Sequence, residues 1–380
     1  MDSKFLVLTL GILMLFGFGF SAAYSNPMVA IPYHIDKTLF ENSKLLGFPN
    51  KNIKIDISVG LKLRNYNQLL YYLKEVSTPG SPLYLKFITK NEFISEYSPS
   101  EMVVMQVSSY FESYGVKVEV GPYNLALFMN NVPLYKAEEM FHTTFGLYYT
   151  PIKGFNHYYF APIGNIYLPS YVAQYISGIS GLTNVYKYSF DLKINKDFIN
   201  SGGVQILTGG DLEKAYQTYL LFNGTANGSP SNTHYFATKY TVATILWEGV
   251  DSNGKQVAPF NPSDVISYYQ QVVPQWIQNI VGSTPNVTGD PVNGAVPPGP
   301  SAGNDSTEAN YESTLDLEMV TTLAPGVNAV EVYGPGNSSG PSETNFPDEE
   351  FAAASKLSNL VAVSNSWGGG DVQGDNVTQN

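Results

Sequence analysis

The sequence predicts an α/β protein of two domains, preceded by an export signal. Three observations lead to this prediction. Strand and helix patterns interleave through the first half, a second series with strongly apolar strands follows, and the charge differs between the halves. Residues 1–199 carry a net charge of +2 and residues 200–380 carry −14, which favours two units with different roles. A chain of 380 residues is also too long for one compact core.

An apolar run from Phe5 to Phe20 follows Lys4 and precedes three small residues, which predicts a signal peptide over residues 1–23. The run is shorter than the ~20 residues that a membrane span needs, although an uncleaved anchor is the alternative. We therefore expect an extracellular, secreted protein, at a membrane only if this run stays uncleaved. Six N-glycosylation sequons agree with export, at Asn223, Asn227, Asn286, Asn304, Asn337 and Asn376.

The composition excludes several kinds of function. The net charge of −12 argues against nucleic acid as a partner, because phosphate binding needs a cationic face. The sequence has no Cys, which excludes disulfides, thiol catalysis and Cys-based zinc sites. Charged residues make up 14% of the chain, against roughly 25% in an ordinary soluble protein. A polar surface with few charges suits an acidic medium.

The first domain, residues 27–190, is predicted as a small α+β unit of ferredoxin-like type. Alternating apolar residues indicate strands, and apolar residues at helical spacing indicate helices. The expected strands are 53–62, 116–120 and 126–132, and the expected helices are 68–76, 91–97, 101–114 and 134–145.

The stretch 78–100 resembles the signature of the activation propeptide of the sedolisins, the kumamolisin-like serine-carboxyl peptidases. The resemblance implies that residues 27–190 are an activation propeptide that inhibits its own catalytic domain. Residues 191–206 are then a polar processing linker, cut between Ser189 and Leu207, and residues 207–380 begin the peptidase domain. The matching residues are Pro79, Ser81, Pro82, Tyr84, Phe87, Thr89, Glu92, Phe93, Tyr97 and Pro99.

The second domain reads as the start of an open parallel α/β sheet of subtilisin type. Its three expected strands are fewer than a parallel sheet with both faces covered usually has, so we expect a truncated subtilisin-like domain. A long loop is expected over residues 281–307. The expected strands are 241–247, 327–333 and 360–365, and the helices are 262–280 with a break at Pro274, 308–323 and 351–357.

Glu312 and Asp316 are the candidate catalytic residues. They are four apart and share one face of the expected helix with apolar residues such as Met319. No Lys or Arg occurs between Lys255 and Lys356 to neutralise them. Two like charges in a dry site cannot easily both ionise, so the pair should titrate as a unit, as an acid/base dyad does. The alternative is an amphipathic helix whose two carboxylates only meet solvent.

Sedolisins carry a Glu-x-x-x-Asp pair on such a helix. By that resemblance, Glu312 is the general base that takes the proton of a catalytic Ser, and Asp316 orients and supports it. Glu248 and Trp367 match two further family positions that extend the network. Without the family resemblance, two alternatives to a role in the network carry equal weight: Glu248 as a solvated residue at a strand end, and Trp367 as a buried aromatic residue of the core. A carboxylate base suits acid, because His is permanently protonated at low pH.

The family's nucleophile lies in a Gly-Thr-Ser segment and its oxyanion Asp in an Ala-Gly-Asp segment, and neither occurs here. We therefore assign no nucleophile and no metal ligand, and expect the chain alone to be inactive on its polypeptide substrate. Calcium is expected in the complete enzyme by resemblance, at a site outside this chain. The alternative is a non-catalytic exported pseudopeptidase or a cell-surface binding protein.

The charge asymmetry also predicts how the domains interact. We expect the near-neutral, Lys-bearing front domain to dock on the acidic back domain. Acid would then protonate carboxylates, weaken the pairing and release the front domain. Maturation should accordingly be triggered by acid and sensitive to salt.

Overall fold

A computed structural model of the protein describes residues 26–190 except 32, 34 and 36, then residue 212, residues 215–222 and residues 236–369. The expected signal peptide, the processing linker and the sequons at Asn223, Asn227 and Asn376 lie outside these ranges. Within them, no helix combines the length and the apolar character that crossing a membrane requires. The described part is a mixed α/β protein, as expected.

The front domain is built on a four-stranded antiparallel sheet in the order β4-β5-β3-β9. Ile55, Ile57 and Val59 alternate along β3 and are completely buried, because they face the helix that carries Val107 and Phe111. The alternation of the sequence is thus the core face of the sheet. The strands are β3 Lys54–Leu61, β4 Glu119–Val120, β5 Ala126–Pro133 and β9 Ile176–Ser180, and the helices that cover them are α4 Glu101–Glu112, α5 Leu134–Met140 and α6 Ser170–Ala173.

Further strands extend the front domain beyond the sequence prediction. The helix expected over residues 134–145 ends at Met140, and Phe145 begins a strand instead. Phe141 and Phe145 are four residues apart, as on one face of a helix, so periodicity alone does not separate the helix from the strand. The additional elements are a β2-β6-β7 sheet (Lys44–Gly47, Phe145–Tyr149, Tyr158–Pro162), a β1-β8 pair (Met28–Ile31, Ile166–Pro169) and the helix α1 Lys37–Glu41.

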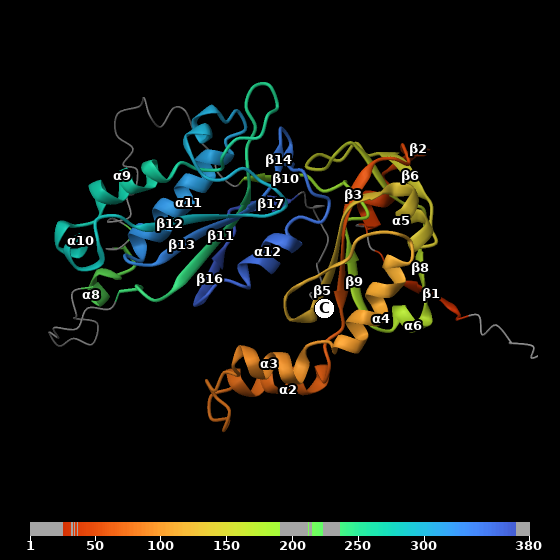
Figure 1. Ribbon diagram of the computed structural model, residues 1–380, viewed down its shortest axis with the longest axis horizontal. Helices are drawn as coiled ribbons and strands as arrows, with labels where there is room; N and C mark the ends of the chain where they lie inside the picture. The colour runs from red at the N-terminus through yellow and green to blue at the C-terminus, as the bar shows by residue number, and fades with distance from the viewer. Residues whose placement is uncertain are drawn as a thin grey trace, which may run out of the picture.

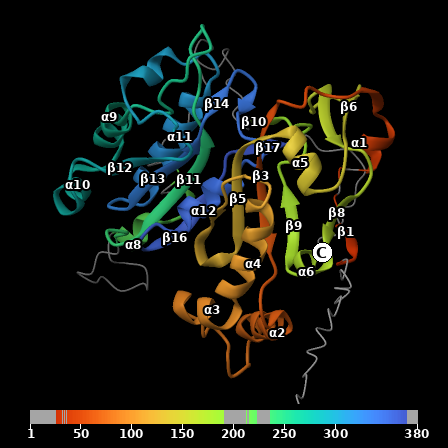
Figure 2. The same ribbon diagram turned by 45° about the vertical axis from the view of Figure 1, so that its right-hand side comes forward.

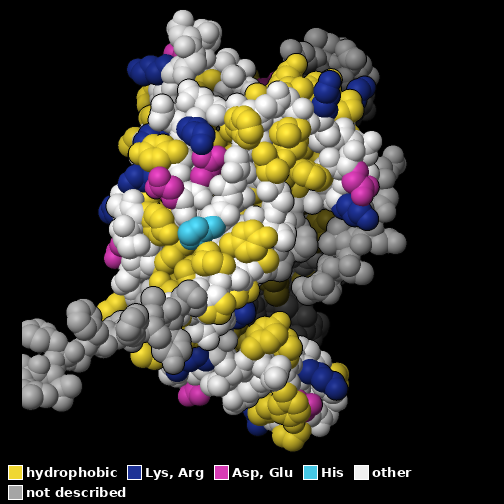
Figure 3. Space-filling view, turned by 90° about the vertical axis from the view of Figure 1, so that its right-hand side faces the viewer, with side chains coloured by type: hydrophobic (Ala, Val, Ile, Leu, Met, Phe, Trp, Pro, Cys, Tyr) yellow, Lys and Arg dark blue, Asp and Glu magenta, His cyan; other side chains and the backbone are white. Residues whose placement is uncertain are grey.

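A pair of helices, α2 Tyr66–Ser77 and α3 Lys90–Tyr97, projects from this domain as an arm. Both ribbon views show it standing away from the sheets (Figures 1 and 2). Thr89 begins α3 with a capping box, since its hydroxyl and the Glu92 carboxylate satisfy each other's backbone N–H groups. Large apolar side chains such as Phe87 are exposed on the arm, and Figure 3 shows hydrophobic groups on the lobe at the foot of this face.

The back domain contains a parallel sheet in the order β12-β13-β11-β16. Helices α9 and α11 cover one face, with Val265 and Leu317 in the core, and α12 covers the other face, which is turned toward the front domain (Figure 1). The elements are β11 Thr241–Trp247, β12 Asn286–Pro291, β13 Asn328–Gly334, β16 Leu360–Ser364, α8 Tyr219–Phe222, α9 Pro262–Val272, α10 Gln275–Val281, α11 Ala309–Leu323 and α12 Asp348–Ala354.

Two sequence predictions meet different outcomes here. The break at Pro274 is confirmed, because α9 ends at Val272 and α10 begins at Gln275. The long loop over residues 281–307 is wrong in part, because it contains the edge strand β12. β12 reads Asn-Val-Thr-Gly-Asp-Pro and has no continuous apolar face. It becomes a strand by pairing with β13, which sequence periodicity does not reveal.

One strand pair joins the two domains. β10 Tyr188–Phe190, the last described strand of the front domain, runs antiparallel to β17 Trp367–Gly369 of the back domain. A short β14-β15 hairpin, Gly336–Asn337 and Gly340–Pro341, lies beside this pair. The domains are therefore connected by main-chain hydrogen bonds as well as by side chains.

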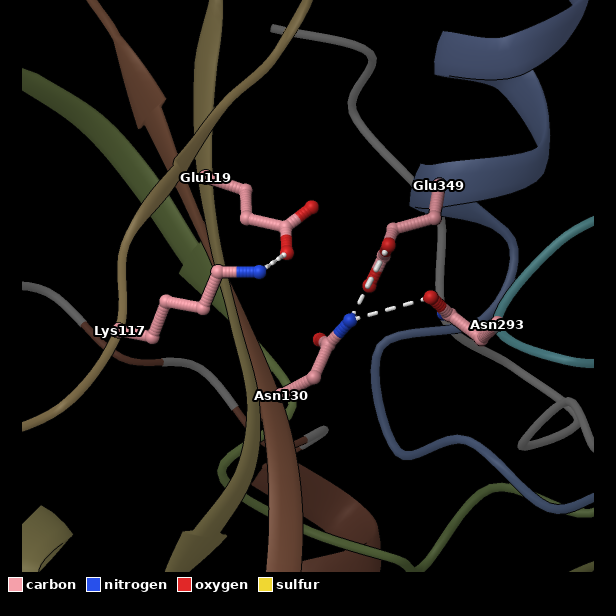
Figure 4. Close-up of polar contacts among 5 residues, drawn as sticks. All are labelled: Lys117, Glu119, Asn130, Asn293 and Glu349. Carbon is pink, nitrogen blue, oxygen red and sulfur yellow. Dashed lines mark hydrogen bonds and ion pairs between the residues drawn. The ribbon is translucent and has the colours of Figure 1, made fainter.

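Side-chain hydrogen bonds also connect the two domains. The Thr344 hydroxyl accepts from the Asp56 backbone N–H at 2.7 Å, and the Tyr123 hydroxyl donates to the Ser355 carbonyl at 2.7 Å. The Asn130 amide donates to Asn293 and Glu349 at 3.2 and 3.3 Å, as Figure 4 shows.

The ion pairs found among the described residues all lie within the front domain. They are Lys37–Glu41, Lys51–Glu138 and Lys117–Glu119, and the last is drawn beside the interface in Figure 4. The expected attraction between front-domain Lys and back-domain carboxylates therefore has no ion pair to carry it in this part of the chain. Acid-triggered release stays a prediction, and the buried carboxyl groups at the interface argue for the opposite dependence on pH.

Candidate active site

The helix α11 turns one of its faces toward the sheet and places Glu312 there. The Asp305 carboxylate fixes the start of the helix, accepting from the Thr307 and Asn310 backbone N–H groups at 2.9 Å each. The Glu312 side chain is 3% exposed, and Asp316, one turn later, is partly buried. The two carboxyl groups thus lie on the inward side of α11, as their spacing predicts, and their catalytic roles stay a prediction.

Asp316 is held by the segment that follows β16. The Ser366 hydroxyl donates to Asp316 Oδ1 at 2.7 Å, which joins α11 to the start of β17. Burial raises the pKa of Asp316 to about 6, and the hydrogen bond from Ser366 opposes this shift. Such a group changes its charge in mildly acidic solution, which is what an acid/base residue in an acidic medium requires.

The structure adds Glu331, a third carboxyl group that the sequence analysis does not include. Glu331 lies in the middle of β13 and is completely buried. Its carboxyl accepts from the Ser313 hydroxyl at 3.0 Å and from the Thr244 hydroxyl of β11. Burial and, to a smaller extent, the nearby charges of Asp316 and Glu312 raise the pKa of Glu331 to about 8, and the two hydrogen bonds oppose this shift.

This environment decides the protonation state of Glu331. At acidic and neutral pH the group holds its proton, so it adds no charge behind the Glu312–Asp316 pair.

The sequence signal of Glu331 is the run Asn-Ala-Val-Glu-Val-Tyr-Gly, where a single Glu interrupts a strand that is apolar on both faces. A charged residue type rarely occupies such a place without a partner, so the run itself marks an unusual site.

Glu248 directly follows β11, at the carboxyl end of this strand, and is completely buried. Its Oε2 accepts from the Val296 backbone N–H at 2.5 Å, and the Tyr333 hydroxyl donates to the Val296 carbonyl at 2.8 Å. Burial raises the pKa of Glu248 to about 7. The alternative of a solvated strand end is therefore wrong, whereas a proton network that joins Glu248 to Glu312 stays a prediction.

Trp367 lies on the opposite face of the sheet, among aromatic rings. Its indole N–H donates to the Ile245 carbonyl at 2.8 Å, and its ring packs against Phe346 at a centroid distance of 5.1 Å. The residue before it, Ser366, is the one that contacts the candidate dyad through Asp316. The expected role of Trp367 in the proton network stays a prediction, and its observed contacts are those of a packed aromatic side chain.

Ser366→Ala is expected to raise the pKa of Asp316 above about 6, because the lost hydrogen bond stabilises the ionised form. The measurement is a pH titration of the labelled carboxyl carbon of Asp316 by NMR. Ser364→Ala, two residues earlier, is the matched control and should leave the midpoint unchanged. An Asp316 midpoint that is the same in both variants would show that the hydrogen bond does not control this group.

A metal ion has no evident site in the ranges that the structure describes. No group of three or more acidic or His side chains there is arranged to hold one. The calcium that the family resemblance implies therefore finds no such group of ligands among these residues.

Comparison with known proteins identifies the front domain. Residues 41–185 match the family model described as the pro-kumamolisin activation domain. Over 135 residues the chain is 29% identical to Xanthomonalisin of Xanthomonas sp. (strain T-22), a match that covers 34% of this chain and 15% of that protein. Both findings agree with the resemblance carried by residues 78–100. The findings therefore support a sedolisin-family propeptide within residues 41–185.

Proposed function

We propose that the chain is the front part of the precursor of an exported, acid-active serine-carboxyl endopeptidase. In this proposal residues 27–190 are a ferredoxin-like inhibitory propeptide, and residues 207–380 are the N-terminal part of a subtilisin-like catalytic domain. The observation that carries it is the pair on α11, with Glu312 buried and Asp316 partly buried and joined through Ser366 to a strand that holds an extended segment of the propeptide.

The carboxyl groups would divide the acid/base work. Glu312 takes the proton of a Ser nucleophile and returns it to the leaving amine, and Asp316 positions Glu312 and shares its charge. The pKa of Asp316, raised to about 6 by burial, supports proton exchange in acidic solution. The nucleophile is not assigned to a residue of this sequence.

Strand β17 supplies a place for a polypeptide substrate. It forms a separate two-stranded sheet with β10, and the pairing of an extended peptide with an available strand is a common mode of peptide recognition. The propeptide would inhibit by occupying β17, and a substrate would take the same place after release.

The test compares peptide hydrolysis by the protein purified from its producing cells with hydrolysis by the 380-residue chain, from pH 3 to pH 7. The first is expected to cleave an unfolded protein with an acidic optimum, and the second to be inactive. Glu312→Gln in the first should reduce cleavage by at least about 10³-fold. Glu318→Gln is the matched control, because this residue lies on the same helix but faces Asp264. Equal rates for Glu312→Gln and the unaltered protein would reject the proposal.

A non-catalytic binding protein is the second candidate, and the missing Gly-Thr-Ser segment is the observation that favours it. Such a pseudopeptidase would bind an extended peptide at β17 without cutting it. Peptide binding without hydrolysis in the protein from its producing cells, unaffected by Glu312→Gln, would support this alternative.

A further inference from the structure

The last described strand of the propeptide places a tyrosine among aromatic rings of the back domain. The Tyr188 ring meets Phe346 and Trp367 edge-on, with centroid distances of 5.4 and 5.6 Å and interplanar angles of 69° and 88°. Phe346 also lies edge-on to Trp247, at 5.4 Å. Trp247, Phe346 and Trp367 form a cluster of rings that we name the aromatic box.

The box is a rigid, prebuilt part of the back domain. Trp247 and Phe346 belong to the core on the α12 side of the sheet, where each is less than 5% exposed. Trp367 is fixed by its hydrogen bond to the Ile245 carbonyl. Edge-to-face packing is the preferred arrangement of aromatic pairs and adds to the energy of simple burial. The box therefore needs no rearrangement to receive a ring.

The box also recognises the polar end of the side chain that it holds. The Tyr188 hydroxyl donates to the Phe346 carbonyl at 3.3 Å. A Cβ on Gly369 would lie 3.7 Å from the Tyr188 ring, so the backbone there passes close to the ring. These contacts fit an aromatic side chain, and its hydroxyl adds one hydrogen bond.

The position of the box connects it to the candidate dyad. Tyr188, Ser189 and Phe190 pair with Gly369, Gly368 and Trp367 in that order, so a strand on β17 runs toward Ser366 and hence toward Asp316. A cavity of about 260 Å³ lies beside the paired strand. It is lined by Ser189, Trp247, Thr307, Glu308 and Gly340 among others, and reaches the start of α11.

We propose that the aromatic box is a substrate side-chain site that takes a Tyr or Phe of an extended polypeptide paired with β17. In the precursor, Tyr188 fills the site in place of that substrate residue. The proposal rests on the proposed function and names its substrate class, namely polypeptides with an aromatic residue that enters the box when they pair with β17. If Tyr188 served only to pack the two domains together, the emptied box would have no preference for an aromatic peptide.

The test uses the tryptophans of the chain as its signal. The sequence has three, and two of them are in the box, so Trp276→Phe leaves an emission that comes from the box alone. In this background Tyr188→Ala empties the site. The probes are the peptides acetyl-Lys-Tyr-Ser-Phe-amide, which copies residues 187–190, and acetyl-Lys-Ala-Ser-Phe-amide.

We expect the Tyr peptide to change the emission saturably and to bind at least about tenfold more tightly than the Ala peptide. Tyr188→Phe is the matched control, because its ring still fills the box, and it should bind both peptides weakly. Equal affinity of the two peptides for the emptied chain would overturn the proposal. So would Tyr-peptide binding that is as strong in Tyr188→Phe as in Tyr188→Ala.

Tyr188→Val, which keeps a residue suited to a strand, replaces Tyr188→Ala if the latter fails to fold. Phe346→Leu in the emptied chain should remove the preference for the Tyr peptide, and a preference that survives it would also overturn the proposal. The assay detects binding and needs no peptide hydrolysis. Failure of the box therefore leaves the dyad's activity untouched, and an inactive dyad leaves the binding result unchanged.

Discussion

Glu331→Gln is expected to remove most of the loss of stability that this buried carboxyl causes between pH 5 and pH 8. Burial raises the pKa of Glu331 to about 8 in the folded protein, against an ordinary value of 4.5. The folded state therefore binds a proton that the unfolded chain releases. Its contribution is complete below pH 4.5 and is lost as the pH rises toward 8, by about 4 kcal/mol. A glutamine has no proton to lose.

The measurement is the free energy of unfolding by denaturant, at several pH values from 5 to 8, for both proteins. The difference between the two curves isolates Glu331 from other titrating groups. The amide of Gln keeps the hydrogen bonds to Ser313 and Thr244 possible, so the variant should fold. Glu308→Gln is the control, because the Glu308 side chain is exposed. Parallel curves for Glu331→Gln and the unaltered protein would mean that Glu331 is ionised when folded.

Glu350→Gln is expected to strengthen the docking of the propeptide at neutral pH. The carboxyl groups of Glu343 and Glu350 crowd together beside Gly334, where an added Cβ would lie 2.7 and 2.3 Å from their oxygens. Burial and the nearby charge of Glu343 raise the pKa of Glu350 well above its usual range, and burial also raises the pKa of Glu343. Asp56 of the propeptide raises the pKa of Glu343 further, across the interface.

The sign of the pH effect follows from these shifts. Groups whose pKa is raised in the docked form favour docking below the ordinary carboxyl pKa, and this contribution is lost as the pH rises. Two lysines, Lys54 and Lys187, line a cavity together with Glu343, and Glu349 accepts a hydrogen bond from the Asn130 amide. Two cationic side chains and one amide therefore also face the cluster. Docking should therefore tighten in acid, which is the opposite of the dependence that the charge asymmetry predicts.

Hydrogen exchange at the Asp56 amide reports on docking directly, because that N–H donates across the interface to Thr344. We expect its protection to fall at least about tenfold from pH 4 to pH 7, after correction for intrinsic exchange. Glu350→Gln should remove most of this fall, since an amide can donate to the Glu343 carboxylate without titrating. Protection that rises with pH in the unaltered protein would restore the acid-release model.

The sequence predicts elements well where local pattern and burial agree. The apolar run over residues 241–247 predicts β11 at its observed bounds, because a central strand of a parallel sheet is buried on both faces. The strand β12 is missed, because its polar residues become a strand only through their pairing with β13. Local periodicity contains no information on such a partner.

Some features of the candidate site could likewise be predicted from the sequence, and others could not. The spacing of Glu312 and Asp316 predicts their shared face, since four residues make about one helical turn. The contact between Ser366 and Asp316 spans 50 residues, and β10 pairs with a strand almost 180 residues away. These contacts depend on the topology of the whole chain. Glu331 is the intermediate case, because the sequence marks it as unusual but not as a neighbour of the pair.

The strand β10 is part of the front domain but pairs with the back domain, and this would separate two events in the proposed maturation. In the maturation that we propose, a cut within residues 191–206 would break the covalent link but leave β10 paired with β17 and the bonds of Asp56 and Tyr123 intact. The nicked protein would then be a complex of two chains, in which the front domain is retained by its own affinity. The lifetime of this complex would be set by a dissociation rate, so the cut would precede the proposed activity by a delay that depends on dilution.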